Sequence, residues 1–161
     1  MPGSLVFAVR LAQDAEIAAA VRLRWLWTVE SGEQPSCDEG NFVEQAAAWA
    51  REHTATHLPH VAVDEKDEVI GMAWLALTPR VPTTRSHNRW AGDLQSCYVL
   101  PAYRDQGVGG ALVHAVLESA KAHGAEHVTV HASVDSARMY ARNGFRENDR
   151  LLWTDVTIAE R

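Results

Sequence analysis

The chain has 161 residues, of which 47% are hydrophobic and 22% charged, and its formal net charge is −6 with neutral histidines. This length predicts one domain with a sizeable core, over residues 1–161. The acidic balance argues against a broad nucleic-acid surface, because such surfaces need clustered Lys and Arg. No stretch approaches the length of a membrane span, and the N-terminus lacks the basic and long apolar parts of a signal peptide. With two cysteines, interpreted as free thiols, these features predict a cytoplasmic protein without nucleic-acid or membrane partners.

Hydrophobic periodicity predicts a chain of mixed strands and helices. In chain order, we expect a strand over residues 5–11, helices over 13–28 and 42–54, strands over 61–63, 69–77 and 93–99, a helix over 108–123, a strand over 127–131, a helix over 134–142 and a final strand over 151–156. The order is βααββ followed by βαβαβ, which is typical of an α/β fold. Polar loops over residues 30–41 and 78–92 interrupt it.

The most informative segment is a glycine-rich loop that joins the strand over residues 93–99 to the next helix. Gly107, Gly109 and Gly110 lie where that helix begins. The first turn of a helix has about four backbone N–H groups without an intrahelical partner, and it carries a partial positive charge. Glycines let a phosphate approach such a turn closely. The sequence therefore predicts a binding site for a phosphorylated ligand here.

A second motif narrows the ligand. The loop reads R-x-x-G-x-G from Arg104, and Y-x-x-N-G-F follows from Tyr140 on a later helix. Together they resemble the GNAT superfamily of acyl-CoA-dependent N-acyltransferases. The resemblance is strong over residues 93–146 and elsewhere rests on element order alone. It implies a GNAT-type fold, with a central mixed β-sheet flanked by helices.

The resemblance implies an N-acetyltransferase that moves the acetyl group of acetyl-CoA directly to an amine in a ternary complex, without a metal. Tyr140 would be the general acid that protonates the departing thiolate. Backbone N–H groups of the glycine loop would bind the pyrophosphate, and the strand before it would pair with the pantetheine arm. The expected cofactor-binding residues are Cys97, Tyr98, Val99, Arg104, Asp105, Gln106, Gly107, Val108, Gly109, Gly110, Ala111 and Ser133. Ser133 stands where asparagine is common in the family; it is expected to share a helix face with Tyr140, and helix capping is its alternative role.

Other interpretations of the glycines fit less well. A dinucleotide-binding loop needs its first glycine directly after the strand, whereas residues 100–106 intervene, and Leu112 occupies the third glycine position. A P-loop needs Gly-Lys-Ser/Thr, which does not occur here. A catalytically idle acyl-CoA-binding sensor on the same fold stays open, because the sequence identifies no general base.

Asp93, Glu30 and Glu33 are the candidate bases, and a water chain is the alternative to all three. The acceptor is expected to be a small-molecule or peptide amine. The acidic loop from Glu30 to Glu39 would attract its ammonium, and arginines 80, 85 and 89 could hold a carboxylate, which suits a zwitterionic or peptide-like amine.

Two further features bear on partners. His53, His57 and His60 have a spacing that can ligate zinc, but Leu58-Pro59 is expected to interrupt the helix, so no metal site is predicted. Exposed strand edges allow a homodimer.

Overall fold

The computed structural model describes residues 3–156. Its elements in chain order are β1 (Phe7–Leu11), the short 3-10 turn η1 (Asp14–Glu16), α1 (Ile17–Glu30), α2 (Glu39–Glu52), β2 (His57–Asp64), β3 (Val69–Arg80), β4 (Arg89–Val99), the 3-10 turn η2 (Pro101–Tyr103), α3 (Val108–Ala122), β5 (Ala125–Val130) and α4 (Ala137–Arg142). The expected α/β fold with a mixed sheet flanked by helices is confirmed.

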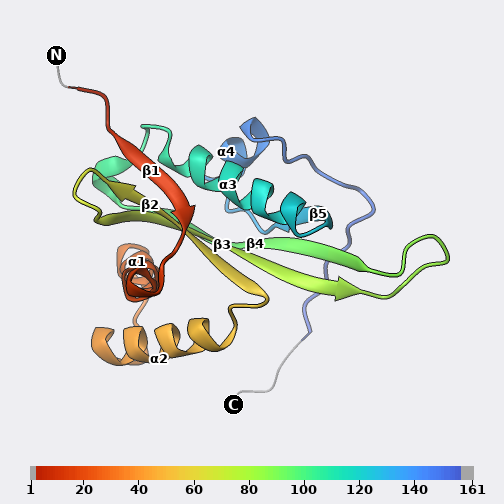
Figure 1. Ribbon diagram of the computed structural model, residues 1–161. Coiled ribbons are helices and arrows are strands. Elements are labelled where there is room, and N and C mark those ends of the chain that lie inside the picture. The colour runs from red at the N-terminus through yellow and green to blue at the C-terminus, as the bar shows by residue number, and fades with distance from the viewer. Residues whose placement is uncertain (1–2, 157–161) are drawn as a thin grey trace.

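The strands form one sheet in the order β1-β2-β3-β4-β5. The three pairs formed among β1 to β4 are antiparallel, and β5 runs parallel to β4 because α3 carries the chain back across the sheet. In Figure 1, α1 and α2 lie on one face of this sheet, and α3 and α4 lie on the other. The hairpin of β3 and β4 extends well beyond the helices.

Each face of the sheet has its own hydrophobic core. Leu112, Val113 and Val116 of α3 are fully buried against one face. On the other face, α1 and α2 pack against Met72 and Trp74 of β3. Alternate strand residues supply the two cores, as the period of two in a β-strand requires.

Several boundaries differ from those expected, for local reasons. α2 begins at Glu39 rather than at residue 42, because the Asp38 side chain accepts the backbone N–H of Asn41 at 2.8 Å and caps the helix. The loop expected over residues 78–92 is shorter, since β3 continues to Arg80 and β4 begins at Arg89. Both of these arginines form ion pairs with Glu126 of β5, and these ion pairs hold the tip-side ends of β3 and β4 against β5.

The final strand expected over residues 151–156 is wrong. This segment has no regular structure, and Leu151, Leu152, Trp153 and Val156 are between 63% and 88% exposed. Its apolar residues match a strand pattern, but strand formation depends on pairing and packing with neighbours, which none of the described strands provides here. The helix expected over residues 134–142 begins at Ala137, after a turn.

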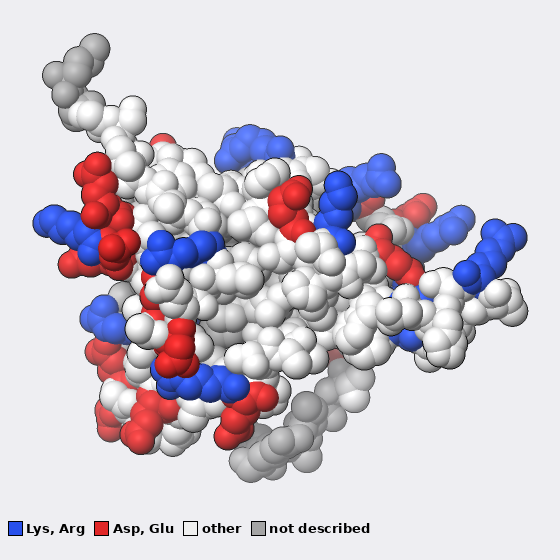
Figure 2. All heavy atoms as spheres, in the orientation of Figure 1, with Lys and Arg blue, Asp and Glu red and all other residues white. Residues whose placement is uncertain are grey.

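The surface carries charges of both signs. On the face shown in Figure 2, acidic and basic side chains are mixed around a largely uncharged centre. None of the helices within residues 3–156 has both the length and the apolar run that a membrane crossing requires.

The buried position of Leu112 gives a stability prediction. Leu112→Ala should lower the free energy of unfolding by roughly 2–5 kcal/mol, because it leaves a cavity in a side-chain site that is 0% exposed. Leu152→Ala is the matched control and should change stability by less than about 0.5 kcal/mol, because Leu152 is 88% exposed. Urea unfolding measures both. A large loss for Leu152→Ala would mean that the C-terminal segment packs against the domain.

Candidate active site

The glycine loop presents bare backbone N–H groups at the start of α3. Gly107 is the N-cap residue with φ of +87°, a left-handed conformation that favours glycine. The first intrahelical bond of α3 is donated by Ala111 to the Gly107 carbonyl at 3.1 Å, and no side chain caps the helix. The N–H groups of Val108, Gly109 and Gly110 therefore precede the helical hydrogen-bond ladder and are available to an anion.

Protein packing does not explain why Gly109 is glycine. A Cβ built on Gly109 would meet only the Val99 side chain, at 4.0 Å, and one on Gly110 would lie 3.6 Å from the Asn143 amide. Both are ordinary contacts, so a methyl group would fit within the fold. The residues here thus fit a ligand that needs close access to the backbone, as a pyrophosphate does.

The strand before the loop is bulged. Gly71 and Met72 of β3 oppose Val99 and Tyr98, but Trp74 opposes Gln95, so β4 has one residue more than β3 across this interval. Ser96 within the interval has a positive φ of 58°. Such a bulge bends the strand and re-aims the side chains beyond it.

Beyond the bulge, β4 also leaves β5. The parallel pairing runs from Trp90 to Leu94, which opposes Val130, and it does not extend to residues 95–99 in the described sheet. The strand residues expected to bind pantetheine, Cys97, Tyr98 and Val99, all lie on this unpaired stretch. An edge of this kind can pair with an amide-bearing chain as a further strand would.

Cys97 and Tyr140 are neighbours on the α3 and α4 side of this edge. Tyr140 is 6% exposed and packs edge-on against Phe145, with ring centroids 5.5 Å apart. Burial, followed by the adjacent Cys97, raises the pKa of Tyr140. Burial also raises the pKa of the Cys97 thiol to about 11, and the Tyr140 hydroxyl lowers it in part. Tyr140 therefore keeps its proton at neutral pH, as a general acid must.

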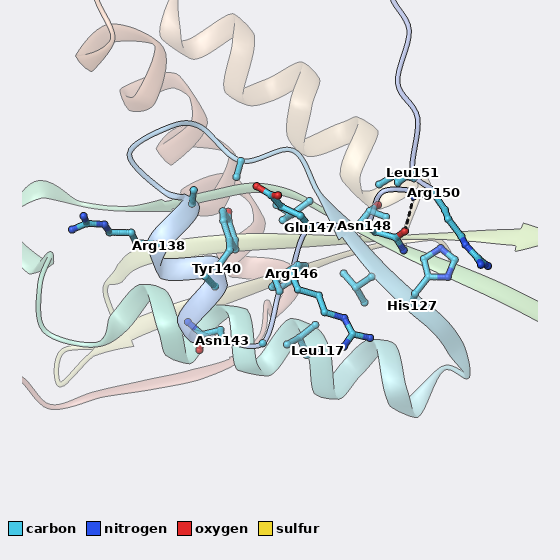
Figure 3. A pocket seen from close by; sticks show the side chains of 18 of the residues that line it. Leu117, His127, Arg138, Tyr140, Asn143, Arg146, Glu147, Asn148, Arg150 and Leu151 are labelled. Carbon is cyan, nitrogen blue, oxygen red and sulfur yellow. Dashed lines mark hydrogen bonds between the residues drawn. The ribbon is translucent and has the colours of Figure 1, made fainter.

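Tyr140 also lines a large open hollow beside α4. The hollow has a volume of about 1260 Å³ and lies between β5, α4 and the chain that follows α4. Figure 3 shows Tyr140 on α4, His127 on β5, and Arg146 and Arg150 on the segment after the helix. Sequence reasoning missed this hollow, because it expected part of that segment to form a strand.

Ser133 does not share a helix face with Tyr140, so that expectation is wrong. Ser133 lies in the turn before α4, where its Oγ accepts the backbone N–H of Ser136 at 3.2 Å and lies 2.8 Å from the Ser136 Oγ. A local turn of this type is a common use of serine, and it is close to the capping alternative.

Arg104 forms a contact that the sequence did not predict. Its guanidinium makes two hydrogen bonds of 2.7 Å to the Glu30 carboxylate, and its Nε donates to the Val99 carbonyl at 2.9 Å. The Tyr98 hydroxyl donates to the same carboxylate at 2.6 Å. The hydrogen bond from Arg104, and then that from Tyr98, lower the pKa of Glu30 to about 2. Glu30 is thus a fixed anion held at the end of α1.

The expected acceptor groups are also arranged differently. Arg80 and Arg89 form ion pairs with Glu126, at 3.2 and 2.7 Å, so they do not form an open carboxylate site. Asp93 accepts hydrogen bonds from Thr129 at 2.7 Å and from Gln95 at 3.0 Å. Glu30, Arg80 and Arg89 are therefore already paired within the protein, and the zwitterionic acceptor stays a prediction.

The three histidines do not converge. His60 is buried on the α3 side of β2, where its Nε2 lies 2.6 Å from the Ser119 Oγ. His53 and His57 pack against Trp49. Within the described residues, no group of three His, Cys, Asp or Glu side chains could hold a metal ion.

Comparison with known proteins identifies the family. The model of the Acetyltransferase (GNAT) family matches residues 19–145. The chain belongs to this family, as its motifs predicted. A glucosamine 6-phosphate N-acetyltransferase from Trypanosoma brucei brucei is 31% identical over 88 residues, which are 55% of this chain and 58% of that relative.

Solved structures share the fold at low sequence identity. A predicted acetyltransferase with acetyl-CoA from Clostridium acetobutylicum has a TM-score of 0.75 and 19% identity, covering 93% of this chain and 96% of its own. A glucosamine-6-phosphate N-acetyltransferase from Arabidopsis thaliana has a TM-score of 0.70 and 14% identity, covering 94% and 98%. At these identities the likeness shows the fold alone.

The ion pair of Glu30 gives a pH-dependent stability prediction. A carboxyl pKa lowered from 4.5 to about 2 on folding stabilises the protein above its ordinary pKa, and the effect is lost as the pH falls toward 2. Glu30→Gln should therefore cost on the order of 1 kcal/mol at about pH 7, since solvent screens this partly exposed pair, and less at about pH 3.5. Urea unfolding at the two pH values measures it. Glu33→Gln is the matched control, and an equal loss for the two variants would contradict the assignment.

Proposed function

We propose that this protein transfers the acetyl group of acetyl-CoA directly to an amine. One observation carries the proposal. The unpaired stretch of β4 has bare N–H groups of α3 at one end, and the Cys97–Tyr140 pair at the bulge at the other. A cofactor with a pyrophosphate, two amides and a thioester has its groups in that order. Membership of the acetyltransferase family supports the same conclusion.

The pyrophosphate would bind at the start of α3. The N–H groups of Val108, Gly109 and Gly110 and the positive end of the helix dipole would hold its charge. Arg104 is a weaker candidate for this role than the sequence indicated, because its guanidinium already forms two bonds with Glu30. Its contribution is to hold the strand end at Val99 in position.

The pantetheine amides would pair with the free edge of β4 at residues 97–99. A backbone N–H at the end of β4 could polarise the thioester carbonyl, but the Leu100 N–H already donates to the Ile70 carbonyl at 2.9 Å. Because successive N–H groups of a strand point to opposite edges, the Val99 N–H is directed away from β3 toward the free edge and is the candidate donor.

The chemistry needs one positioned proton. The amine nitrogen forms a bond to the thioester carbonyl carbon, the C–S bond breaks, and the thiolate takes the Tyr140 proton. The proton lost by the nitrogen then restores the phenol through solvent. A free thiol has a pKa of about 8.5 and a free phenol about 10, so this transfer would be slightly uphill in water. Burial raises the pKa of Tyr140, and it also raises the pKa of a thiol beside it, as at Cys97, so desolvation of the thiolate offsets part of the desolvation of the phenol.

A catalytically idle acyl-CoA-binding sensor is the alternative on the same fold. Both proposals need the glycine loop, but only the enzyme needs the Tyr140 hydroxyl. Two substitutions therefore test cofactor binding and catalysis separately.

Gly109→Glu tests the cofactor site. It should abolish acetyl-CoA binding, because it adds bulk and a negative charge where the phosphates would lie. Gly109→Ala fits within the fold, since its methyl group meets only Val99 at 4.0 Å, and it should weaken binding less than Gly109→Glu because it adds little bulk and no charge. Calorimetry measures the affinity, and circular dichroism shows that each variant is folded. Undiminished acetyl-CoA affinity in folded Gly109→Glu would overturn the assignment.

Tyr140→Phe tests the general acid. It should lower kcat by on the order of 10²–10⁴-fold and change the KM for acetyl-CoA much less, because packing against Phe145 is retained. The assay follows CoA release with a panel of amines. Cys97→Ala is a useful comparison, since it removes the neighbouring thiol and keeps the hydroxyl. Turnover at the parent rate in Tyr140→Phe would show that the tyrosine only packs.

A further inference from the structure

A small cavity lies on the face of the sheet opposite to Tyr140. It lies between α1, α2 and the strands, is open to solvent, and has a volume of about 170 Å³. Its lining includes Gln95 and Ser96, where the bulge of β4 begins. The cavity therefore reaches β4 next to Cys97, the point at which the proposed acetyl transfer would take place.

The walls of this cavity are mainly aromatic. Phe42 and Trp49 come from α2, and Trp74 comes from the centre of β3. Trp49 packs edge-on against His57, with ring centroids 4.9 Å apart, and Trp74 is 9% exposed. Aromatic walls bind a planar ring well, by stacking or by edge-to-face contact.

The charges near the cavity select against acceptors with several amines. The nine lining residues, all in the described part of the chain, include no Asp or Glu, and Arg24 contributes a permanent positive charge. Burial, and then the nearby His53, lower the pKa of His57, so its ring is neutral at pH 7. A second ammonium group would meet Arg24 with no carboxylate in the cavity to offset the repulsion.

One end of the cavity suits a single amino group. Gln95 donates its Nε2 hydrogen to Asp93 at 3.0 Å, which leaves its side-chain carbonyl oxygen as an acceptor. The Asp93 carboxylate behind it favours a positive charge at that end. An amine bound at Gln95 would lie beside Ser96 and the bulge.

We propose that this cavity holds the ring of the acetyl acceptor, and that the acceptor is a monoamine with one aromatic ring on a short alkyl arm. An apolar cavity of about 150 Å³ is large enough for benzene, so the volume of this cavity suits one ring. This inference rests on the proposed acetyl transfer and adds the class of acceptor to it.

Amine selectivity tests the proposal directly. Initial rates of CoA release are compared for 2-phenylethylamine, butylamine, spermidine and glucosamine 6-phosphate. We expect kcat/KM for 2-phenylethylamine to exceed that for butylamine by at least about tenfold, because only the former fills the aromatic walls. A preference for spermidine or glucosamine 6-phosphate would overturn the proposal.

Two substitutions on α2 form a matched pair. Ala46 lines the cavity, whereas Ala48 is exposed on the same helix and does not. Ala46→Phe should fill the cavity and raise the KM for 2-phenylethylamine by at least about tenfold, with the KM for acetyl-CoA unchanged. Ala48→Phe should change neither. An unchanged amine KM in folded Ala46→Phe would exclude the cavity as the acceptor site.

A second pair covers the case in which Ala46→Phe does not fold. Trp49→Ala removes one aromatic wall of the cavity at a side chain that is already 45% exposed, so the fold should tolerate it. Trp153→Ala removes an exposed tryptophan that does not line the cavity. Only Trp49→Ala should raise the KM for 2-phenylethylamine. Equal effects of the two substitutions would contradict the assignment.

Calorimetry separates failure of this proposal from failure of the proposed function. 2-Phenylethylamine is titrated into the protein saturated with CoA, which needs no turnover. Turnover of another amine without binding of 2-phenylethylamine would reject only the aromatic acceptor. Binding of 2-phenylethylamine that Ala46→Phe abolishes, without turnover of any amine, would support the cavity and reject acetyl transfer.

Discussion

The bulge in β4 is the constraint on which the rest of the site depends. Leu94 belongs to the core under α3, and Tyr98, four residues later, belongs to the core under α1. In a regular strand residues four apart lie on the same face, so this reversal requires the extra residue at Ser96–Cys97. The same change of direction takes β4 away from β5. One inserted residue therefore opens the strand edge, turns Cys97 toward Tyr140 and turns Tyr98 toward Glu30.

The Glu30–Arg104 pair connects the two sides of the site across that bulged strand. Glu30 ends α1, on the side of the aromatic cavity, and Arg104 lies three residues before Gly107 on the side of the glycine loop. The guanidinium also lies over the Tyr98 ring, 5.2 Å from its centroid, and Tyr98 stacks on Trp27. The bidentate ion pair therefore joins the end of α1 to the chain that leads into the glycine loop. This explains why an arginine here serves the loop geometry even though its charge is already paired.

The sequence predicted the parts of this protein that depend on local chemistry. The glycine loop, the start of α3 at Val108 and the position of Tyr140 on a short helix follow from glycine conformations, helical periodicity and the family motif. The bulge could not be predicted, because serine is not a residue type that favours a positive φ. The bulge arises from the pairing of β4 with β3. Glu30 was expected to face the acceptor, whereas it pairs with Arg104, which lies 74 positions later in the chain. The prediction for residues 151–156 failed for the opposite reason: their local pattern matches a strand, but none of the described strands pairs with them.

Burial of Tyr140 keeps its proton in place at neutral pH, but it also makes the phenol a weaker acid. A phenol in water would be a slightly weaker acid than a thiol, and desolvation of the phenol alone would widen the gap. At this site the leaving thiolate would be desolvated together with the phenol, because both would lie on the side of β4 that α3 and α4 cover. On that side burial raises the pKa of the Cys97 thiol to about 11. The difference between the two pKa values, rather than either value, determines whether the proton moves. Desolvation of the thiolate thus offsets part of the pKa difference that burial of the tyrosine adds, and the sheet separates this proton donor from the cavity on the opposite face.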